Sequence, residues 1–384
     1  MAAGRNILEK QLMGIKKILF HINDMSRGGA QRVLSILIKK LVEDGLDIAL
    51  VTLWTADNEY ELPSAVKRID VRKEIGDKGR LGNIIFRHTE LRKLIKRESP
   101  DLVVTFGEKA CFRAAVSMQG IKIPLIVSVR NNPYISFAKN PIMTRLMEKK
   151  ASGCVFQTKM AKEFFSKGLQ DKSVIILNPL DEKYLNADIS KSSSTGFIRI
   201  VTAGRIVKEK NHMLLVKAFG DIADKYPNAI VQIYGSPDDK QIVGSISDYA
   251  KEKDLEKRIE LKGINNNLEN ELQGASLFVL SSDSEGMPNA LMEAMALGIP
   301  VISTDCPCGG PDMLIEDEVN GLLVPVGDEK ALAKAMSRLI DDKTLAERLS
   351  VEGLKIRETA KADMIISQWK GYFDEVFEKA LCRR

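Results

Sequence analysis

The chain has 384 residues, of which 44% are hydrophobic and 28% charged, with a formal net charge of +5. That composition excludes a disordered chain, and no apolar run reaches the length of a membrane span. The length exceeds one ordinary hydrophobic core and predicts two domains of about 150–200 residues each. The first 17 residues have no apolar segment of signal-peptide type, and the five cysteines are scattered. We therefore expect a cytoplasmic protein.

The charge is unevenly distributed along the chain. Residues 1–180 hold 31 Lys and Arg against 18 Asp and Glu, a net +13, and the remainder holds 26 against 34, a net −8. A basic N-terminal half suggests an anionic partner. A nucleic acid is one candidate, but no binding motif is present and the aromatic residues are not interleaved with the basic ones. An anionic membrane face or a phosphate-bearing lipid acceptor fits better, and a merely solubilising surface is the alternative.

In the first half, short apolar runs alternate with amphipathic stretches. Such alternation predicts a parallel sheet covered by helices. Helices are expected over about 30–44 and 160–167. Strands are expected at Lys17–Ile22, Ile48–Leu53, Asp101–Phe106, Leu125–Val129 and Cys154–Gln157.

Two loops in this half are candidate ligand sites. Gly28 and Gly29 stand at the first strand-to-helix turn, where the lack of side chains would let a phosphate approach the backbone. A simple turn is the alternative. Arg130 follows the strand at 125–129, and its guanidinium could hold a phosphate or an acidic group with two parallel hydrogen bonds. An arginine on an exposed loop is the alternative.

The polar stretch Asn186–Gly196 is the best candidate for a linker between domains. Strands and helices then alternate again. Helices are expected over about 213–226 and 268–275, and another helix is expected to end with residues 249–254. Strands are expected at Ile198–Ala203, Ala229–Tyr234, Ile259–Lys262, Leu277–Leu280 and from Val301 onward.

A basic loop follows the first strand of the second half. Arg205 and Lys210 stand in this loop, just before a helix. Two cations beside the free N–H groups of a helix start would act on the same anion, so we expect a pyrophosphate site here.

Two carboxylates flank a second helix start. Glu285 lies in the loop after Leu277–Leu280, and Glu293 lies inside the helix that follows. The free N–H groups near Met287, Asn289 and Ala290 would attract an anion. Acids beside an anion site suit sugar hydroxyls better than phosphate. A solvated turn Glu and an exposed helix Glu are the alternative.

The sequence segments around these acids resemble those of a known family. The segment from Glu285 to Ile302 resembles the E-x7-E signature of the family 4 glycosyltransferases, which are retaining enzymes with the two-domain GT-B fold. Arg205 and Lys210 match that family's Gly-Arg-x4-Lys signature, and the segment from Gly28 to Val33 resembles its Gly-Gly-Ala-Glu-Arg-Val segment. The resemblance covers nearly the whole chain and is strongest over 198–325.

Residue roles follow from that resemblance. It implies that Glu285 contacts the donor sugar, that Glu293 contacts the ribose, and that Arg205 and Lys210 bind the pyrophosphate. The whole donor-binding set that it implies is Gly28, Gly29, Arg205, Lys210, Ile264, Glu285, Gly286, Met287, Pro288, Asn289, Ala290 and Glu293. The chain departs from the family where many members have a His that contacts the sugar, because Arg130 stands there. Arg130 therefore joins Glu285, Arg205 and Lys210 as a candidate catalytic residue.

The resemblance also implies the architecture. We expect an α/β protein of GT-B type, with two doubly wound Rossmann-like domains facing a central cleft. Residues 1–180 form the acceptor-side domain and 181–363 the nucleotide-sugar domain. The amphipathic terminal segment, 364–384, is expected to pack back on the first domain.

The implied activity is transfer of a sugar from a UDP-hexose or UDP-N-acetylhexosamine to a lipid-linked saccharide, in capsular, exopolysaccharide or O-antigen synthesis at the inner face of the plasma membrane. No Asp-x-Asp motif is present, so we expect neither a metal nor a cofactor beyond the nucleotide-sugar. Cys306-Pro307-Cys308 has no nearby His or second pair, so a turn is expected there instead of a metal site. A nucleotide-sugar epimerase and a binding protein that has lost catalysis are the rival hypotheses.

Overall fold

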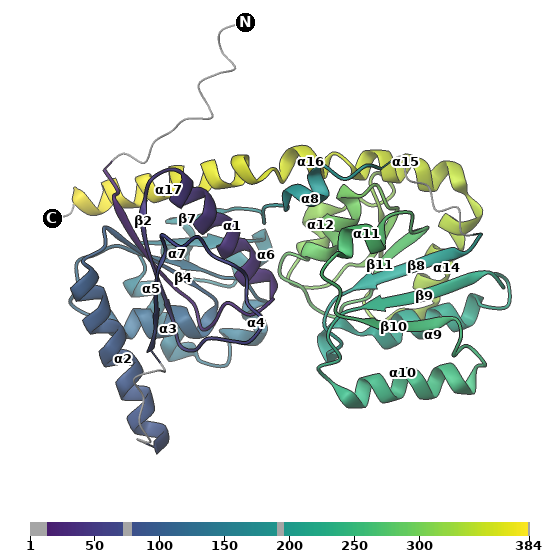
Figure 1. The fold of residues 1–384 in the computed structure, drawn as a ribbon, viewed down its shortest axis with the longest axis horizontal. Helices are drawn as coiled ribbons and strands as arrows, with labels where there is room; N and C mark the ends of the chain where they lie inside the picture. The colour runs from purple at the N-terminus through teal and green to yellow at the C-terminus, as the bar shows by residue number, and fades with distance from the viewer. Residues whose placement is uncertain (1–13, 72–78, 190–195, 383–384) are drawn as a thin grey trace, which may run out of the picture. The chain divides into compact units, whose positions relative to one another are not determined.

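The computed structural model describes residues 14–71, 79–189 and 196–382 (Figure 1). The chain divides into two compact units, which we call unit 1 (1–179 and 362–384) and unit 2 (180–361). Each unit is built on one all-parallel sheet with helices. The prediction of an α/β protein with two doubly wound domains is therefore confirmed.

Unit 1 contains a seven-stranded sheet with the order β3-β2-β1-β4-β5-β6-β7. Its central strands are short apolar runs buried on both faces, as parallel strands between helices require. The order reverses between β1 and β4, which pair in parallel with Ile18 opposite Leu102. The strands are β1 (Lys17–His21), β2 (Asp47–Thr52), β3 (Lys67–Asp70), β4 (Leu102–Phe106), β5 (Leu125–Ser128), β6 (Gly153–Phe156) and β7 (Ser173–Ile175).

The helices of unit 1 follow their strands in sequence, except the last. They are α1 (Gly29–Glu43), α2 (Gly79–Glu98), α3 (Glu108–Ser117), α4 (Pro133–Ser136), α5 (Pro141–Lys150), α6 (Lys159–Glu163), α7 (Lys167–Gln170) and the C-terminal α17 (Ala362–Leu381). Helix α17 lies along unit 1 beside α1 (Figure 1). Trp369 of α17 is fully buried and stacks on Phe106, with 5.7 Å between the ring centroids. The Tyr372 hydroxyl accepts a hydrogen bond from the Cys154 amide at 2.8 Å.

Unit 2 repeats the same winding with six strands in the order β10-β9-β8-β11-β12-β13. The strands are β8 (Ile198–Ala203), β9 (Ala229–Tyr234), β10 (Ile259–Gly263), β11 (Leu277–Leu280), β12 (Val301–Thr304) and β13 (Leu322–Val324). The helical elements are α8 (Glu182–Leu185), η2 (Lys208–Lys210), α9 (His212–Ile222), α10 (Lys240–Glu252), α11 (Leu268–Leu272), α12 (Asn289–Ala296), α13 (Gly310–Leu314), α14 (Glu329–Asp341), α15 (Lys343–Gly353) and α16 (Ile356–Thr359).

The strand order of unit 2 reverses between β8 and β11. In open α/β sheets, ligands bind beyond the carboxyl ends of the strands at such a reversal. The loop with Arg205 leaves β8 and the loop with Glu285 leaves β11. The winding of unit 2 therefore brings the two predicted sequence motifs to one edge.

Some local predictions were wrong. The helix expected over 160–167 is two short helices, α6 and α7. Between them, Phe164 packs on Tyr134 and Phe165 packs on Phe137 and Phe156, and these contacts bend the chain. The segment 186–196, expected to link the domains, follows α8 inside unit 2, and its residues 190–195 lie outside the described part. Helix α8 belongs to unit 2 because it packs on α12.

Candidate functional site: a lysine–glutamate cluster at the strand ends of unit 2

Glu285 is the centre of the predicted site and is buried, with 7% of its surface exposed. Its carboxylate oxygen Oε1 accepts hydrogen bonds from Lys210 Nζ at 2.5 Å and from Ser282 Oγ at 2.7 Å. The alternative of a solvated turn glutamate is therefore wrong. A buried carboxylate requires such donors because desolvation of an isolated charge is costly.

The backbone around Glu285 is fixed by the loop after β12. The Glu285 amide donates to the Pro307 carbonyl at 2.8 Å, and the Cys308 amide donates to the Glu285 carbonyl at 2.7 Å. Gly310 allows this approach, since an added Cβ would lie 1.7 Å from the Gly286 carbonyl oxygen. A side chain at Gly310 would push the Glu285 loop out of place.

The basic loop is joined to the same edge by several bonds. Asn211 is the N-cap of α9, in the left-handed region with φ of 42°, and its side-chain oxygen accepts from the Leu214 amide at 3.3 Å. Its amide nitrogen donates to Asp283 Oδ1 at 2.7 Å, and the Asp283 amide donates to the Glu209 carbonyl at 2.9 Å. These bonds hold the backbones of the Lys210 and Glu285 loops together.

Arg205 differs from Lys210 in its surroundings. Its side chain is 66% exposed, and its guanidinium lies 3.5 Å from Asp238. The turn that carries it is tight, because a Cβ on Gly235 would lie 1.8 Å from the Gly204 carbonyl oxygen. The structure thus brings Lys210 and Glu285 into contact and leaves the Arg205 side chain open to solvent. His212, which begins α9 after this loop, is buried, and burial lowers its pKa to about 4, so it is neutral at pH 7.

The helix start beside Glu285 is also as expected in its main features. Helix α12 begins at Asn289, with Pro288 at its N-cap and no side-chain cap. The Leu291 and Met292 amides both point to the Pro288 carbonyl, at 3.2 and 3.3 Å. Glu293 is 3% exposed, so it is not the exposed helix glutamate of the alternative. Ile264, at the predicted base-reading position, is 62% exposed in the loop after β10.

The glycine loop lies at the corresponding edge of unit 1. Gly28 precedes α1 in extended conformation, and Gly29 is the first residue of that helix. A Cβ on Gly28 would lie 2.6 Å from the Gln31 side-chain oxygen. The loop is therefore compact, and donor contact by Gly28 and Gly29 stays a prediction.

Arg130 of unit 1 is not on an exposed loop, so that alternative is wrong. It is 7% exposed, its guanidinium carbon lies 4.6 Å from the Phe106 ring centroid, and its Nη1 donates to Asn178 Oδ1 at 3.0 Å. No carboxylate in the described part of the chain forms an ion pair with it. Burial lowers its pKa to about 9, so it stays charged at pH 7. Its predicted contact with a phosphate stays a prediction.

A second buried arginine of unit 1 was not predicted. Arg113 on α3 is 8% exposed and donates to His21 Nε2 at 2.8 Å and to Asn23 Oδ1 at 3.3 Å. Burial, then the charge of Arg113, lowers the pKa of His21 to about 3. The ring Nδ1 faces the Val51 carbonyl at 2.8 Å, so it carries the proton and Nε2 accepts. No local pattern marks such pairs, because their members are 92 residues apart.

Ser282, Asn211 and Asp283 are further site residues that the sequence analysis missed. Only Asn211 gave a signal, since Asn directly before a helix is a common N-cap. The Asp283 contact with Asn211 joins two loops and needed the fold, whereas Ser282 bonds Glu285 three residues along its own loop. As for the cysteines, Cys306 is buried and burial raises its pKa to about 12. The described residues contain no group of metal-binding side chains.

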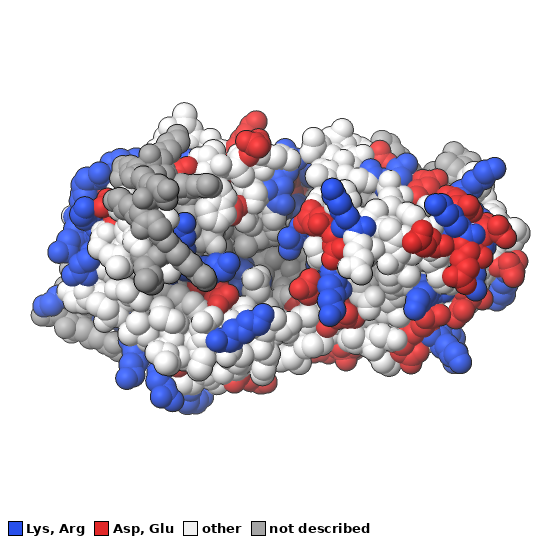
Figure 2. Space-filling model, turned by 90° about the horizontal axis from the view of Figure 1, so that it is seen from below, with Lys and Arg blue, Asp and Glu red and all other residues white. Residues whose placement is uncertain are grey.

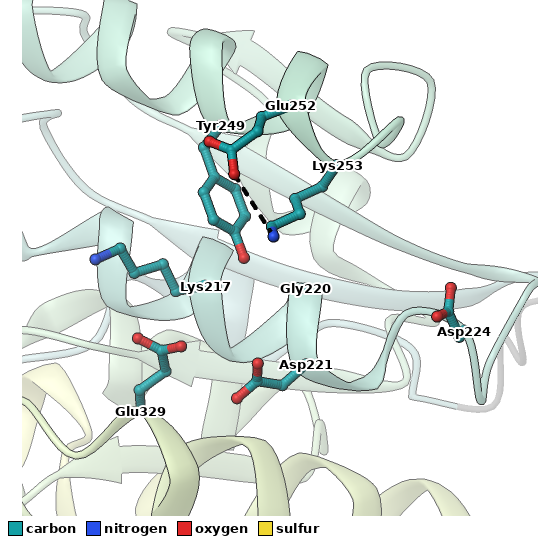
Figure 3. A pocket seen from close by; sticks show the side chains of 8 residues that line it. All are labelled: Lys217, Gly220, Asp221, Asp224, Tyr249, Glu252, Lys253 and Glu329. Atoms are coloured by element: carbon teal, nitrogen blue, oxygen red, sulfur yellow. Dashed lines mark ion pairs between the residues drawn. The ribbon is translucent and has the colours of Figure 1, made fainter.

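A hollow of unit 2 lies elsewhere, between α9, α10 and α14 (Figure 3). It measures about 440 Å³ and is open and polar. Its lining residues are Lys217, Gly220, Asp221, Asp224, Tyr249, Glu252, Lys253 and Glu329. None of the predicted site residues lines it, and its acids and lysines are those of a solvated surface.

The charge division follows the units. Unit 1 carries 35 Lys and Arg against 22 Asp and Glu, a net +13, and unit 2 carries 22 against 30, a net −8. On the face drawn in Figure 2, basic side chains gather over unit 1 and acidic ones are most frequent over unit 2. None of the helices in the described part of the chain has the length and hydropathy needed to cross a bilayer.

Comparison with known proteins divides the chain near the boundary between units 1 and 2. Residues 27–184 match the family model Glycosyltransferase Family 4, and residues 187–355 match Glycosyl transferases group 1. An uncharacterised glycosyltransferase of Methanocaldococcus jannaschii is 28% identical over 75% of this chain and 82% of its own length.

Two further relatives have informative names. The Campylobacter jejuni enzyme named GalNAc-alpha-(1->4)-GalNAc-alpha-(1->3)-diNAcBac-PP-undecaprenol alpha-1,4-N-acetyl-D-galactosaminyltransferase is 25% identical over 87% of this chain and 91% of its own length. The crystal structure of Anabaena HepE in complex with UDP superposes with a TM-score of 0.78 at 17% identity, over 94% of this chain and 100% of that one. The two family models account for both units, and the chain belongs to the family 4 glycosyltransferases of the GT-B fold.

Proposed function

We propose that this glycosyltransferase is a retaining enzyme that moves a hexose or N-acetylhexosamine from a UDP-linked donor to a lipid-linked saccharide in the synthesis of a surface polysaccharide. The observation that carries the proposal is the contact of Lys210 with buried Glu285 at the strand reversal of unit 2. A cation, a carboxylate and an uncapped helix start lie together there, and these are the groups that a nucleoside diphosphate-sugar requires.

The leaving group of this reaction is a nucleoside diphosphate, which gains negative charge as the glycosidic bond breaks. Lys210, Arg205 and the amides at the start of α12 would stabilise that charge. One such preorganised donor is worth about 3–4 kcal/mol in the transition state. These groups would serve in place of a divalent metal, so we expect activity in the presence of EDTA.

The carboxylates would hold the two sugars of the donor. Glu285 would accept a hydrogen bond from a hydroxyl of the transferred sugar and so orient the anomeric carbon. Glu293 would accept a hydrogen bond from a ribose hydroxyl. The acceptor hydroxyl would attack from the face that the diphosphate leaves, and the departing phosphate would take its proton. The configuration of the anomeric carbon is then retained.

Two observations support a lipid-linked acceptor. The Campylobacter relative is named for an acceptor that carries diphospho-undecaprenol. Unit 1 carries a net charge of +13, which suits a phosphate-bearing lipid and the anionic surface of the membrane that holds it. Peripheral binding at the inner face of the plasma membrane is part of the proposal.

A donor screen tests the proposal. Purified protein is mixed with UDP-, GDP- and ADP-sugars, and the melting temperature is recorded, because a bound ligand stabilises the folded state by mass action. UDP-sugars are expected to raise it. The donor that binds is then incubated with a lipid-linked saccharide and EDTA, and the anomeric configuration of the product is read by NMR. An inverted product, or activity abolished by EDTA, contradicts the mechanism. Conversion of the donor without an acceptor would instead indicate an epimerase.

A further inference from the structure

The two carboxylate oxygens of Glu285 have different surroundings. Oε1 accepts both hydrogen bonds, from Lys210 Nζ at 2.5 Å and from Ser282 Oγ at 2.7 Å. In the described part of the chain, Oε2 accepts none. The protein thus holds one oxygen with two donors and leaves the other for a ligand hydroxyl.

Ser282 is the immobile donor of the two. It is fully buried two residues after the end of β11, and its side chain has one rotatable bond before the oxygen. Its carbonyl accepts a hydrogen bond from Thr304 Oγ1 at 2.5 Å, and Thr304 ends the neighbouring strand β12. The Ser282 backbone is therefore fixed at the sheet edge, and its hydroxyl can move only by rotation about the single Cα–Cβ bond.

Lys210 is the mobile donor. Its backbone is held, because its amide donates to the Val207 carbonyl at 3.1 Å and its carbonyl accepts from Ser281 Oγ at 3.3 Å. Its side chain is 24% exposed and carries three donors on a flexible four-carbon stem. The ammonium group can swing to an anion nearby while the backbone stays in place.

Movement of Lys210 would leave Glu285 as a buried charge without its counterion. Loss of one partner from such a pair is costly unless other donors remain. From these contacts we propose that Lys210 is shared between Glu285 and the donor diphosphate, and that Ser282 is the positioning residue that holds Glu285 when Lys210 turns to the diphosphate. The inference rests on the proposed function, since it takes the diphosphate to bind beside Lys210.

The inference predicts a coupling that can be measured with UDP, which has a diphosphate but no transferred sugar. UDP would draw Lys210 away and leave Ser282 as the one protein donor to Glu285. We expect Ser282→Ala to weaken UDP binding about 10-fold or more, because a hydrogen bond to a charged group is lost. We expect Glu285→Gln to tighten UDP binding by about threefold or more, because the neutral amide releases Lys210.

The decisive experiment is a double-mutant cycle on the full chain. UDP affinity is measured by titration calorimetry for the wild type, Ser282→Ala, Glu285→Gln and the double variant. Once residue 285 is neutral, Ser282→Ala should change the affinity by less than about twofold, because no buried charge is left to hold. Ser303→Ala is the matched control: Ser303 is fully buried on β12 and donates to the Thr304 carbonyl, so its loss should leave UDP affinity unchanged.

Folding of each variant is checked by circular dichroism, and Ser282→Thr, which keeps the hydroxyl, should restore the wild-type affinity. If Ser282→Ala does not fold, Ser282→Cys replaces it in the cycle. An equal loss in both backgrounds, or no loss in either, overturns the inference. A wild type that binds inorganic pyrophosphate but not UDP removes UDP from the proposed function, and the cycle is then read with pyrophosphate. A wild type that binds neither overturns both proposals.

Discussion

Units 1 and 2 have the same order in their first six strands, which unit 1 extends by β7, but they hold their cations in opposite ways. At the strand ends of unit 2, Lys210 pairs with the buried carboxylate of Glu285. At the strand ends of unit 1, Arg113 and Arg130 are buried against His21, Asn23, Asn178 and aromatic rings, and no described carboxylate pairs with either. The comparison teaches that the same winding supplies a ligand edge, while the residues at that edge decide whether charge is balanced within the protein.

The largest expected effect comes from removal of the acid in unit 2. Glu285→Ala should lower turnover of the donor found in the screen by about 100-fold or more, because an interaction with the reacting sugar is lost. The fold should persist, as circular dichroism will show. Glu256→Ala, on an exposed residue of the same unit, is the control and should keep the wild-type rate. An unchanged rate for Glu285→Ala would remove this residue from the site.

A smaller effect is expected from removal of either cation of the basic loop, Lys210 or Arg205. Lys210→Met leaves Glu285 buried without its counterion and should lower the free energy of unfolding by about 2 kcal/mol in urea titrations. Arg205→Met removes a mainly exposed side chain and should change that energy by less than about 1 kcal/mol. Both should weaken UDP binding. Equal stability losses would show that the two cations are held alike, contrary to the structure.

Each unit contains one buried histidine that makes the free energy of unfolding depend on pH. Folding lowers the pKa of His21 to about 3 in unit 1 and that of His212 to about 4 in unit 2, each from 6.5, mainly through burial. The contribution of each neutral histidine to the free energy of unfolding is present in full above pH 6.5. It is lost as pH falls from 6.5 toward the pKa of that histidine in the folded protein. His212→Gln should therefore remove on the order of 2 kcal/mol of the loss in unfolding free energy between pH 6.5 and 4.

In unit 1, a carboxylate adds to the loss of unfolding free energy at still lower pH. Glu98 accepts from Lys67 at 2.8 Å and from Lys17 at 3.0 Å, and these bonds lower its pKa from 4.5 to about 2. Its stabilisation is present above pH 4.5 and declines as pH falls toward 2. Glu98→Gln should flatten the stability profile in that window and leave the profile above pH 5 parallel to that of the wild type. An unflattened profile below pH 4.5 would contradict the network.

The smallest effect is expected at Arg130. Arg130→Met keeps the apolar packing on Phe106 and removes a charge with no counterion, and Asn178 keeps its donor from Gln157 at 2.7 Å. We expect a change of less than about 1 kcal/mol in unfolding free energy, since a buried charge is often replaceable by an apolar side chain of similar volume. A loss as large as that of Lys210→Met would break the contrast between the units.

The sequence was sufficient for the two-domain α/β architecture because parallel strands buried on both faces leave continuous apolar runs, such as Leu277–Leu280. It was also sufficient to mark Glu285 and Lys210, since each belongs to a local motif with a physical purpose. Their contact with each other was not predictable, because it depends on how β8 and β11 lie together in the sheet. The polar linker was misplaced for a similar reason, since packing of α8 on α12 has no local signature.

The central claim is that a nucleoside diphosphate binds at the strand reversal of unit 2, beside Lys210. A crystal structure of the protein with UDP tests this most directly. The account predicts diphosphate oxygens within hydrogen-bonding distance of Lys210 Nζ and the α12 start, with Arg205 turned toward them and Ser282 still bonded to Glu285. Diphosphate density elsewhere, with Lys210 and Arg205 both facing bulk water, would contradict it.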